Sequence, residues 1–380
     1  MMDGTDLARL CKQRGWSRAR LMLELRNVAR GKGRGLLPDD PSLKRMIREW
    51  VHGRRGLSAD YAALFSDVFG VPFAAGRGNA APVPSPVATD LAARLAVAEA
   101  IDAPLIVSLE AQTQSFRTLD RQLGAARLLQ QTEAHVGQMT DLWRYALPGA
   151  HRTVLAAALA EAAALAGWQA LDLGDPEKAW SLHETAKAAA RESGIPSIVA
   201  HVTAQQAYAL LDLGRSASAV TLIQHARQAA NGKVPDLLRS WLWAAEAEAL
   251  AANGAADEAQ EALDHAGAAL PSQGLDESLP YLFLNEVHLA RWRGHCLARL
   301  GKSEAVQELA NAVNLLDPTF TRAAAGLRCD LALAYSVRGQ HEEARAEARV
   351  AEELATRTAS ARQRRRIAAL LTSGTGPSGR

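Results

Sequence analysis

The residue types that most often carry catalysis are present in this sequence, but their spacing does not assemble a reactive centre. The segment from Gly294 to Ser303, GHCLARLGKS, ends like a phosphate-binding loop, yet six residues separate its two glycines where such a loop has four. The ten histidines are scattered, and there is neither a His-Glu-x-x-His zinc motif nor a nucleophile elbow. The sequence therefore predicts no enzyme, no metal site and no cofactor.

The cysteines and the hydropathy pattern bear on the compartment. Cys11, Cys296 and Cys329 are far apart and show neither a paired nor a metal-binding spacing. The N-terminus has no apolar run of signal-peptide length, and no stretch reaches about 18 consecutive apolar residues. We therefore expect reduced thiols in a cytoplasmic protein that has no membrane partner.

Positive charge is concentrated in residues 1–73, which hold 14 lysines and arginines against 8 acidic residues. A helix beginning at Pro41, with Asp40 as its N-cap, would bury one apolar stripe and show a cationic side opposite. The stripe consists of Leu43, Met46, Ile47, Trp50 and Val51. Such a cationic helix in a small helical domain predicts DNA binding. The candidate base-reading residues are Ser42, Lys44, Arg45 and Arg48, and the candidate phosphate contacts are Arg54 and Arg55.

The segment Trp50-Val-His-Gly-Arg-Arg55, followed by Ser58 and Tyr61-Ala-Ala-Leu-Phe65, resembles the Xre-type helix-turn-helix of actinobacterial regulators. In that family Trp-Glu-x-Gly ends the recognition helix, whereas here Val51 stands in place of the Glu and residues 31–40 form a long loop. The resemblance implies double-stranded DNA as a partner. The alternative is a domain that keeps the fold without binding DNA.

Five turn glycines recur along the second half of the chain at steps of 40, 40, 47 and 38 residues. They are Gly174, Gly214, Gly254, Gly301 and Gly339, and a small residue stands seven positions before each: Gly167, Ala207, Ala247, Gly294 and Ala332. Glycine ends helices in the left-handed conformation, and small residues let two helices approach closely. The period predicts a solenoid of helix pairs. The alternative is an unrelated alanine-rich helical bundle.

This pattern resembles tetratricopeptide (TPR) repeats, which carry a small residue at position 8, a turn glycine near position 15 and alanines at positions 20 and 27. The first repeat shows Gly167, Gly174, Ala179 and Ala186, and four further units follow, of which the one containing Gly294 and Gly301 is one residue short after its turn. The resemblance implies an all-α fold, with a small helix-turn-helix domain followed by a TPR-like helical solenoid. The expected segments are 1–72 (helix-turn-helix), 73–89 (linker), 90–149 (capping helices), 150–361 (repeats) and 362–380 (basic, disordered tail).

TPR proteins bind extended peptides on the concave face that the first helix of each pair lines. Repeat positions 2, 5, 9 and 13 give the ligand-binding candidates Glu161, Trp168, Asp172, His201, Tyr208, Asp212, Trp241, Glu248, His288, Arg291, His295 and Arg299. We expect Asp212 and Glu248 to meet a basic residue or amino terminus of the ligand, and Arg291 and Arg299 to meet a carboxylate. The alternatives are a polar face without a ligand and, for Trp241, simple packing between repeats.

The sequence favours a transcriptional regulator whose N-terminal domain binds DNA. Its TPR domain would sense a peptide or protein ligand and form a homodimer. The alternative is a TPR scaffold that recruits partner proteins and keeps a degenerate helix-turn-helix. A basic cluster near the C-terminus is either a solvated final helix or a nucleic-acid contact; it consists of Arg362, Arg364, Arg365 and Arg366.

Overall fold

Helices make up all of the regular secondary structure in the described part of the chain, which comprises residues 2–32, 37–75, 86–230, 232–272 and 276–373. The structure is a computed structural model of the full sequence. The predicted all-α fold is confirmed. The chain divides into two units, Met1–Ala93 and Arg94–Arg380.

The N-terminal unit is built from short helices: η1 (Gly4–Asp6), α1 (Leu7–Gln13), α2 (Arg18–Gly31), α3 (Asp40–Val51) and α4 (Ala59–Phe69). Ser17 caps α2, Asp39 caps α3 and Ser58 caps α4, each side chain accepting a hydrogen bond from a backbone N–H three residues on. The prediction that Asp40 caps α3 is wrong by one residue. The helix already includes Asp40, and Pro41 falls within the first turn, where its missing N–H is not needed.

Trp50 is the centre of this unit's core and is 1% exposed. Its ring lies 5.6 Å edge-on from Phe65 and 4.6 Å from Tyr61. A Cβ on Gly4 would lie only 2.9 Å from the Cβ of Trp50, so the glycine lets η1 pack directly on α3. The predicted apolar stripe of α3 faces this core, and the lysine and arginine side chains of the helix are exposed.

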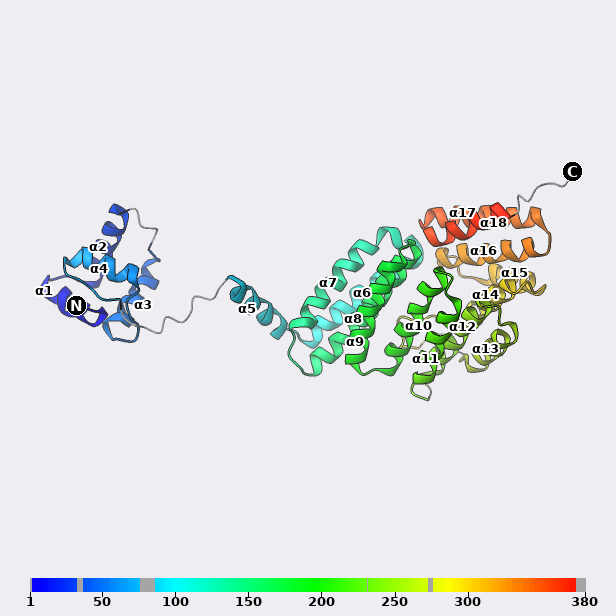
Figure 1. Cartoon of the computed structure of the whole chain (residues 1–380), viewed down its shortest axis with the longest axis horizontal. Helices are drawn as coiled ribbons and strands as arrows, with labels where there is room; N and C mark the ends of the chain where they lie inside the picture. Colours follow the sequence, from blue (N-terminus) through cyan, green and yellow to red (C-terminus); the bar gives the residue numbers. More distant parts are fainter. Residues whose placement is uncertain (1, 33–36, 76–85, 231, 273–275, 374–380) are drawn as a thin grey trace. The chain divides into compact units, whose positions relative to one another are not determined.

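The second unit is a row of helix pairs, as the repeat pattern predicts (Figure 1). The pair that precedes the repeats is α6 (Ala103–Leu123) and α7 (Leu129–Tyr145), with η2 (Ala125–Arg127) between them. The repeat pairs are α8 (Ala150–Asp172) and α9 (Pro176–Ser193), α10 (Pro196–Asp212) and α11 (Ser216–Ala230), α12 (Asp236–Ala252) and α13 (Ala256–Ala269), α14 (Glu286–Arg299) and α15 (Ala305–Leu315), and α16 (Thr321–Val337) and α17 (His341–Arg357). A last helix, α18 (Ala361–Ser373), follows them.

The predicted linker ends earlier than expected. Helix α5 (Pro86–Glu99) begins inside the predicted segment 73–89. Proline suits the first turn of a helix, and the residues that follow include the helix formers alanine and leucine. Residues 76–85 of the predicted linker lie outside the described residues.

Close packing within the repeat pairs depends on small residues at the predicted positions. A Cβ on Gly167 would lie 2.5 Å from the ring of His183, and one on Gly294 would lie 2.5 Å from Leu309 Cγ. The five turn glycines have φ between 70° and 81°, a conformation that side chains with a Cβ adopt only with strain. The solenoid of helix pairs that the sequence predicts is therefore confirmed.

α8 lies at the centre of the solenoid core. By length and composition alone it could cross a membrane, but 78% of its most apolar window is buried inside the protein. Leu155 and Leu159 are fully buried among alanines of the neighbouring helices. The alanine-rich composition thus lets helices approach on several sides of α8.

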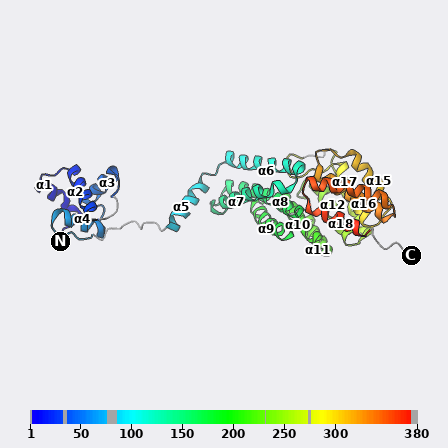
Figure 2. The same cartoon turned by 90° about the horizontal axis from the view of Figure 1, so that it is seen from above.

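The final helix closes the row of pairs on itself. Ser360, just before α18, donates a hydrogen bond of 2.7 Å to Asp172 at the end of α8, across 188 positions of sequence. Arg322 of α16 lies 2.5 Å from Asp120 of α6. Figure 2 shows α6 running toward the last helix pair, where Thr358 at the end of α17 meets the end of α6. The solenoid is thus a closed arrangement in which α6 contacts α16 and the end of α17, and α8 contacts α18.

The predicted disordered tail is wrong for residues 362–373, which belong to α18. A cap and a buried side chain help to order this helix. Ser360 Oγ accepts a hydrogen bond of 3.2 Å from the Gln363 N–H in its first turn, and Ile367 is buried at 2% exposure. Residues 374–380 lie outside the described residues.

The seam between α6 and α17 should be sensitive to a single methyl group. Gly124 has φ +79°, and a Cβ there would lie 2.2 Å from the carbonyl oxygen of Thr358. With φ +79° and ψ 169°, Gly124 lies in a region that is essentially restricted to glycine, so Gly124→Ala should lose about 1–3 kcal/mol from backbone strain and a further 1–3 kcal/mol from overpacking. The measurement is the free energy of unfolding in urea. Gly254→Ala is the matched control, because Gly254 has φ +77° and open space around it. Equal decreases in the free energy of unfolding of the two variants would contradict close packing between Gly124 and Thr358.

Candidate ligand-binding cavity

The inner face of the solenoid holds a cavity of about 630 Å³. Its walls come from the even-numbered helices α6 to α18 and from the loop before α14. Every groove residue predicted from the repeat positions lines it: Glu161, Trp168, Asp172, His201, Tyr208, Asp212, Trp241, Glu248, His288, Arg291, His295 and Arg299. The structure thus brings the predicted residues together, and ligand binding by them remains a prediction.

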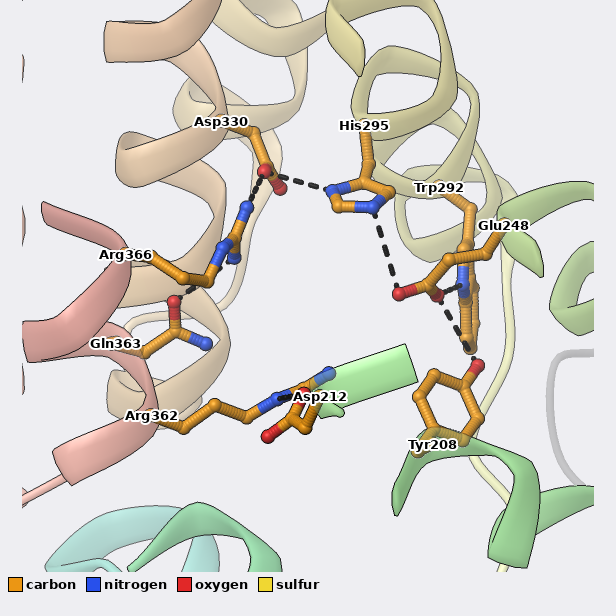
Figure 3. A network of polar contacts seen from close by, with 9 residues as sticks. All are labelled: Tyr208, Asp212, Glu248, Trp292, His295, Asp330, Arg362, Gln363 and Arg366. Atoms are coloured by element: carbon orange, nitrogen blue, oxygen red, sulfur yellow. Dashed lines mark hydrogen bonds and ion pairs between the residues drawn. The ribbon is translucent and has the colours of Figure 1, made fainter. Parts of the chain in front are cut away.

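Glu248 is the centre of a buried polar network (Figure 3). Its Oε2 accepts hydrogen bonds from Tyr208 Oη at 3.2 Å and from Trp292 Nε1 at 2.7 Å, and its Oε1 lies 3.6 Å from His295 Nε2. Burial acts to raise the pKa of Glu248, but the positive charges of His295 and Arg362 and the Trp292 hydrogen bond outweigh it and lower the pKa. Glu248 is therefore held as a carboxylate in the cavity wall.

Asp330 of α16 forms the second half of this network. It accepts from His295 Nδ1 at 2.8 Å and forms an ion pair with Arg366 of α18. Burial opposes ionisation of Asp330, yet Arg366 and His295 hold its pKa well below the usual range. The imidazole of His295 thus lies between two carboxylates. Its Nδ1 is hydrogen-bonded to Asp330, whereas its Nε2 faces Glu248 beyond hydrogen-bond distance.

A second arginine of α18 enters the cavity and meets Asp212. Arg362 Nε donates to Asp212 Oδ1 at 2.8 Å, and the Arg365 guanidinium lies 3.8 Å from Oδ2. The Arg362 guanidinium lies 5.6 Å from the centroid of Trp168 and 5.9 Å from that of Tyr208. The carboxylate and both aromatic rings are therefore engaged by the chain's own arginine.

Two groups of cavity residues have partners that the sequence did not predict. Asp212 and Glu248 were expected to meet a basic group of the ligand; they accept hydrogen bonds from Arg362, Trp292 and Tyr208, and contact with a ligand stays a prediction. The C-terminal basic cluster is not simply solvated: Arg362 and Arg366 face the cavity, whereas Arg364 is exposed. The physical reason is the closure of the solenoid, which sets α18 against the inner helices.

Two further ion pairs link the pair α6–α7 to the repeats. Arg117 lies 2.8 Å from Glu161 of α8, and Arg322 lies 2.5 Å from Asp120. Burial raises the pKa of Glu161 and of Asp120, although the neighbouring arginines counteract it. These two ion pairs join α6 to α8 and α6 to α16 in the wall of the cavity.

Aromatic side chains form the rest of the wall. His201 stacks on Tyr281 with a centroid distance of 4.4 Å and tilts against Trp241 at 4.9 Å. His288 packs edge-on against Phe283 and Phe320 at 4.9 and 5.0 Å. Burial lowers the pKa of both His201 and His288 to about 3. Both imidazoles are therefore neutral at physiological pH.

The repeat positions missed several residues that line the cavity. The missed charged residues are Arg117, Asp120, Arg121, Arg322, Asp330, Arg362, Arg365 and Arg366. Those of α6 and α18 lie outside the repeats, so no repeat position indicates them. Asp330 stands at repeat position 6, as do the cavity-lining residues Leu165 and Gln205. Including position 6 would have found it.

The predicted DNA-binding residues lie together on α3 and the turn that follows it. Lys44, Arg45, Arg48, Arg54 and Arg55 are exposed, and Ser42 is half-buried. Arg55 lies 3.8 Å from Glu49, so part of its charge is balanced on the surface. The placement agrees with a surface-reading helix, and contact with DNA stays a prediction.

Comparison with known proteins gives fold-level likeness only. No family model and no curated protein match the chain. A solved Rap protein complexed with Competence and Sporulation Factor is 15% identical, with 71% of this chain and 72% of that one covered and a TM-score of 0.49. BtubC (BKLC) from P. vanneervenii is 17% identical (68% and 95% covered, TM-score 0.41). A kinesin light chain-like repeat protein from Podosopora anserina is 19% identical (50% and 92% covered, TM-score 0.34).

His201 should make stability depend on pH. Its pKa is near 6.5 in the unfolded chain and about 3 in the folded protein. The unfolded state therefore takes up the proton first, and stability present above about pH 6.5 is lost as the pH falls toward 3, by up to about 1.4 kcal/mol per pH unit.

The corresponding test replaces His201 with phenylalanine, which keeps the stacked ring and removes the titration. Between about pH 7 and pH 5, the free energy of unfolding of His201→Phe should fall by roughly 2 kcal/mol less than that of the wild type. His225→Phe, at an exposed histidine of α11, is the control and should follow the wild type. Parallel curves for His201→Phe and the wild type would show that this histidine does not carry the effect.

Proposed function

We propose that this protein is a DNA-binding regulator whose solenoid binds a short peptide in its inner cavity. The cavity is the observation that carries the proposal. Its 630 Å³ lies within the range of about 300–1,000 Å³ that is common for ligand pockets. Aromatic rings and fixed polar groups alternate around it, and this combination suits a peptide with apolar side chains and a polar backbone.

Closure of the solenoid favours a small ligand over a large protein surface. A scaffold that recruits folded partners needs an open concave face, whereas α18 sets Arg362 and Arg366 across this one. The regulator therefore accounts for the cavity better than the alternative, a TPR scaffold with a degenerate helix-turn-helix.

The N-terminal unit supports the DNA-binding half of the proposal. α3 buries its apolar stripe around Trp50 and exposes lysine and arginine side chains. Helix-turn-helix proteins commonly gain specificity by pairing two half-sites. We therefore include self-association in the proposal. Light scattering on the full chain should give twice its mass of 40.6 kDa. A monomer mass at micromolar concentration would contradict self-association.

The proposed mechanism is a shift between two arrangements of the solenoid. A ligand that touches helices from both ends of the closed row binds one arrangement better than the other. The spacing of two DNA-binding units in a dimer would then change with ligand occupancy.

The peptide-binding half can be tested by filling the cavity. Ala323 of α16 lines the cavity, whereas Ala346 of α17 is exposed and does not. Immobilised full-length protein should capture members of a degenerate pentapeptide library, and Ala323→Trp should lower the captured amount about tenfold or more because the indole occupies the ligand's space. Ala346→Trp should capture as much as the wild type. Equal capture by both variants, with unchanged thermal melts, would place the ligand elsewhere.

The DNA-binding half can be tested on α3. Promoter fragments enriched from genomic DNA by the purified protein provide the probe for a gel-shift titration. Arg45→Ala with Arg48→Ala should weaken specific binding by about 1–3 kcal/mol for each lost base contact, while Arg54→Ala should lower the salt slope by roughly one unit. Arg349→Ala, on an exposed arginine of α17, is the control. Unchanged affinity in the Arg45/Arg48 double variant would mean that α3 does not read DNA.

A further inference from the structure

The arginines of the cavity fall into two classes. Eight arginines and six carboxylates line it. Five of these arginines lie within 4 Å of a carboxylate: Arg117, Arg322, Arg362, Arg365 and Arg366. Among the described residues, no ion pair within that distance involves the other three, which are Arg121, Arg291 and Arg299. The cavity therefore carries positive charge that its own carboxylates do not pair.

Two of these three arginines are partly withdrawn from water. Arg121, in the last turn of α6, and Arg291 of α14 are half-buried, whereas Arg299 is exposed. The Arg121 guanidinium lies 5.6 Å from the ring centroid of Phe320, and the Nε of Arg291 is buried without a hydrogen-bond partner. Burial and the like charges of Arg117 and Arg322 lower the pKa of Arg121. Asp120 and Glu248 act on these two arginines only from beyond ion-pair distance. A half-buried cation without a carboxylate in direct contact is stabilised when an anion joins it.

His288 lies within the field of both arginines. After burial, the charges of Arg291 and Arg121 are the causes that lower its pKa. Asn285 Oδ1 accepts the backbone N–H of His288 at 3.0 Å and lies 2.8 Å from its Nδ1. Because that oxygen can only accept, Nδ1 must carry the proton. The Nε2 of His288 is buried and has no partner, so it is the nitrogen left for a ligand.

We propose that Arg121, His288 and Arg291 form a subsite for an oxyanion of the ligand, a carboxylate or a phosphate. The inference rests on the proposed ligand-binding function and specifies the chemistry of one end of that ligand. The two guanidinium groups supply charge-assisted hydrogen bonds to the anion. Neutral His288 presents Nε2 as an acceptor, so it does not bind the oxyanion itself but can accept from an N–H or O–H group of the ligand beside the anion. Phe283 and Phe320 close the apolar side of the subsite.

This subsite differs from the one that the repeat positions indicate. They pair Arg291 with Arg299, two turns further along α14. The proposed subsite instead joins Arg291 with Arg121 of α6, because Phe320 lies against both Arg121 and His288 and the charges of both arginines act on His288. The difference is measurable, because Arg299→Gln should leave anion recognition intact while Arg121→Gln should remove it. Arg349→Gln, at an exposed arginine of α17 outside the cavity, controls for the loss of one charge.

The experiment uses immobilised full-length protein and an equimolar mixture of mass-tagged degenerate pentapeptides in two forms. One form has a free C-terminal carboxylate, and the other has a C-terminal amide. In a parallel arm, inorganic phosphate is titrated in thermal melts. The wild type should enrich the carboxylate form about tenfold or more, and Arg121→Gln and Arg291→Gln should each reduce that enrichment toward one. Arg299→Gln and Arg349→Gln should keep it.

Each outcome decides the inference. If the carboxylate form is preferred and the preference is lost in the two variants, the anion is a peptide carboxylate. If the forms bind equally, but phosphate raises the melting temperature of the wild type and not of Arg121→Gln or Arg291→Gln, the subsite takes phosphate. Equal binding of the two forms without a phosphate effect overturns the subsite and leaves the peptide-binding cavity standing. If neither peptides nor phosphate bind, the subsite and the proposed function fall together. The comparison of the carboxylate and amide peptides on the wild-type protein tests the subsite even if a variant fails to fold.

Discussion

The structure of the solenoid depends on how charge is accommodated on its inner face. Carboxylates from α6, α8, α10 and α16 lie there, and each meets an arginine from another helix. Two of these pairs, Asp120–Arg322 and Asp212–Arg362, join helices distant in sequence. Removing one partner of such a pair costs about 3–5 kcal/mol because the other charge remains buried. Replacing both partners with apolar residues is often neutral, so these pairs select which helices meet rather than add net stability. The pairs of Arg362 and Arg366 select the closed arrangement, in which α18 lies across the inner helices.

The small residues of the repeats provide the geometry in which those pairs form. Gly167 and Gly294 let the two helices of a pair approach to distances that a Cβ would prevent, and positive-φ glycines set the turn between them. The first helix of each pair is thereby turned inward, and its side chains at positions 2, 9 and 13 converge on one cavity. Close helix packing and the convergence of charge are therefore two consequences of the same repeat.

Much of this arrangement could be predicted because it repeats. Glycine and alanine at fixed offsets predict the five helix pairs, and the repeat positions identify residues that do line the cavity. The partners of those residues could not be predicted in the same way. Arg117 and Arg121 lie before the repeats and Arg362 and Arg366 lie after them, so their contacts arise from closure of the whole solenoid. The local sequence of the C-terminal basic cluster, residues 362–366, is the same whether its helix is packed against the protein or exposed to solvent.

Closure also explains why several cavity residues have partners that the repeat does not predict. Asp212 lies in the cavity as the repeat predicts, and Arg362 of the distant α18 donates a hydrogen bond to it. The same closure brings Arg121 of α6 near His288 of α14, two residues that repeat positions alone would never relate. Local sequence therefore determined which side chains face inward, and long-range closure determined which of them remain open to a ligand.

Hydrogen–deuterium exchange of α18 in the unmodified protein tests the closed solenoid most directly. If α18 is held by its buried arginines, the amides of its central turn should be protected to within about 1 kcal/mol of those of the inner helix α8, because both open in one cooperative unit. Arg366→Met should lower protection in α18 and at the C-terminal end of α8 together. Exchange of the wild-type α18 at the rate of an unfolded peptide, with α8 still protected, would contradict the closed arrangement on which this account depends.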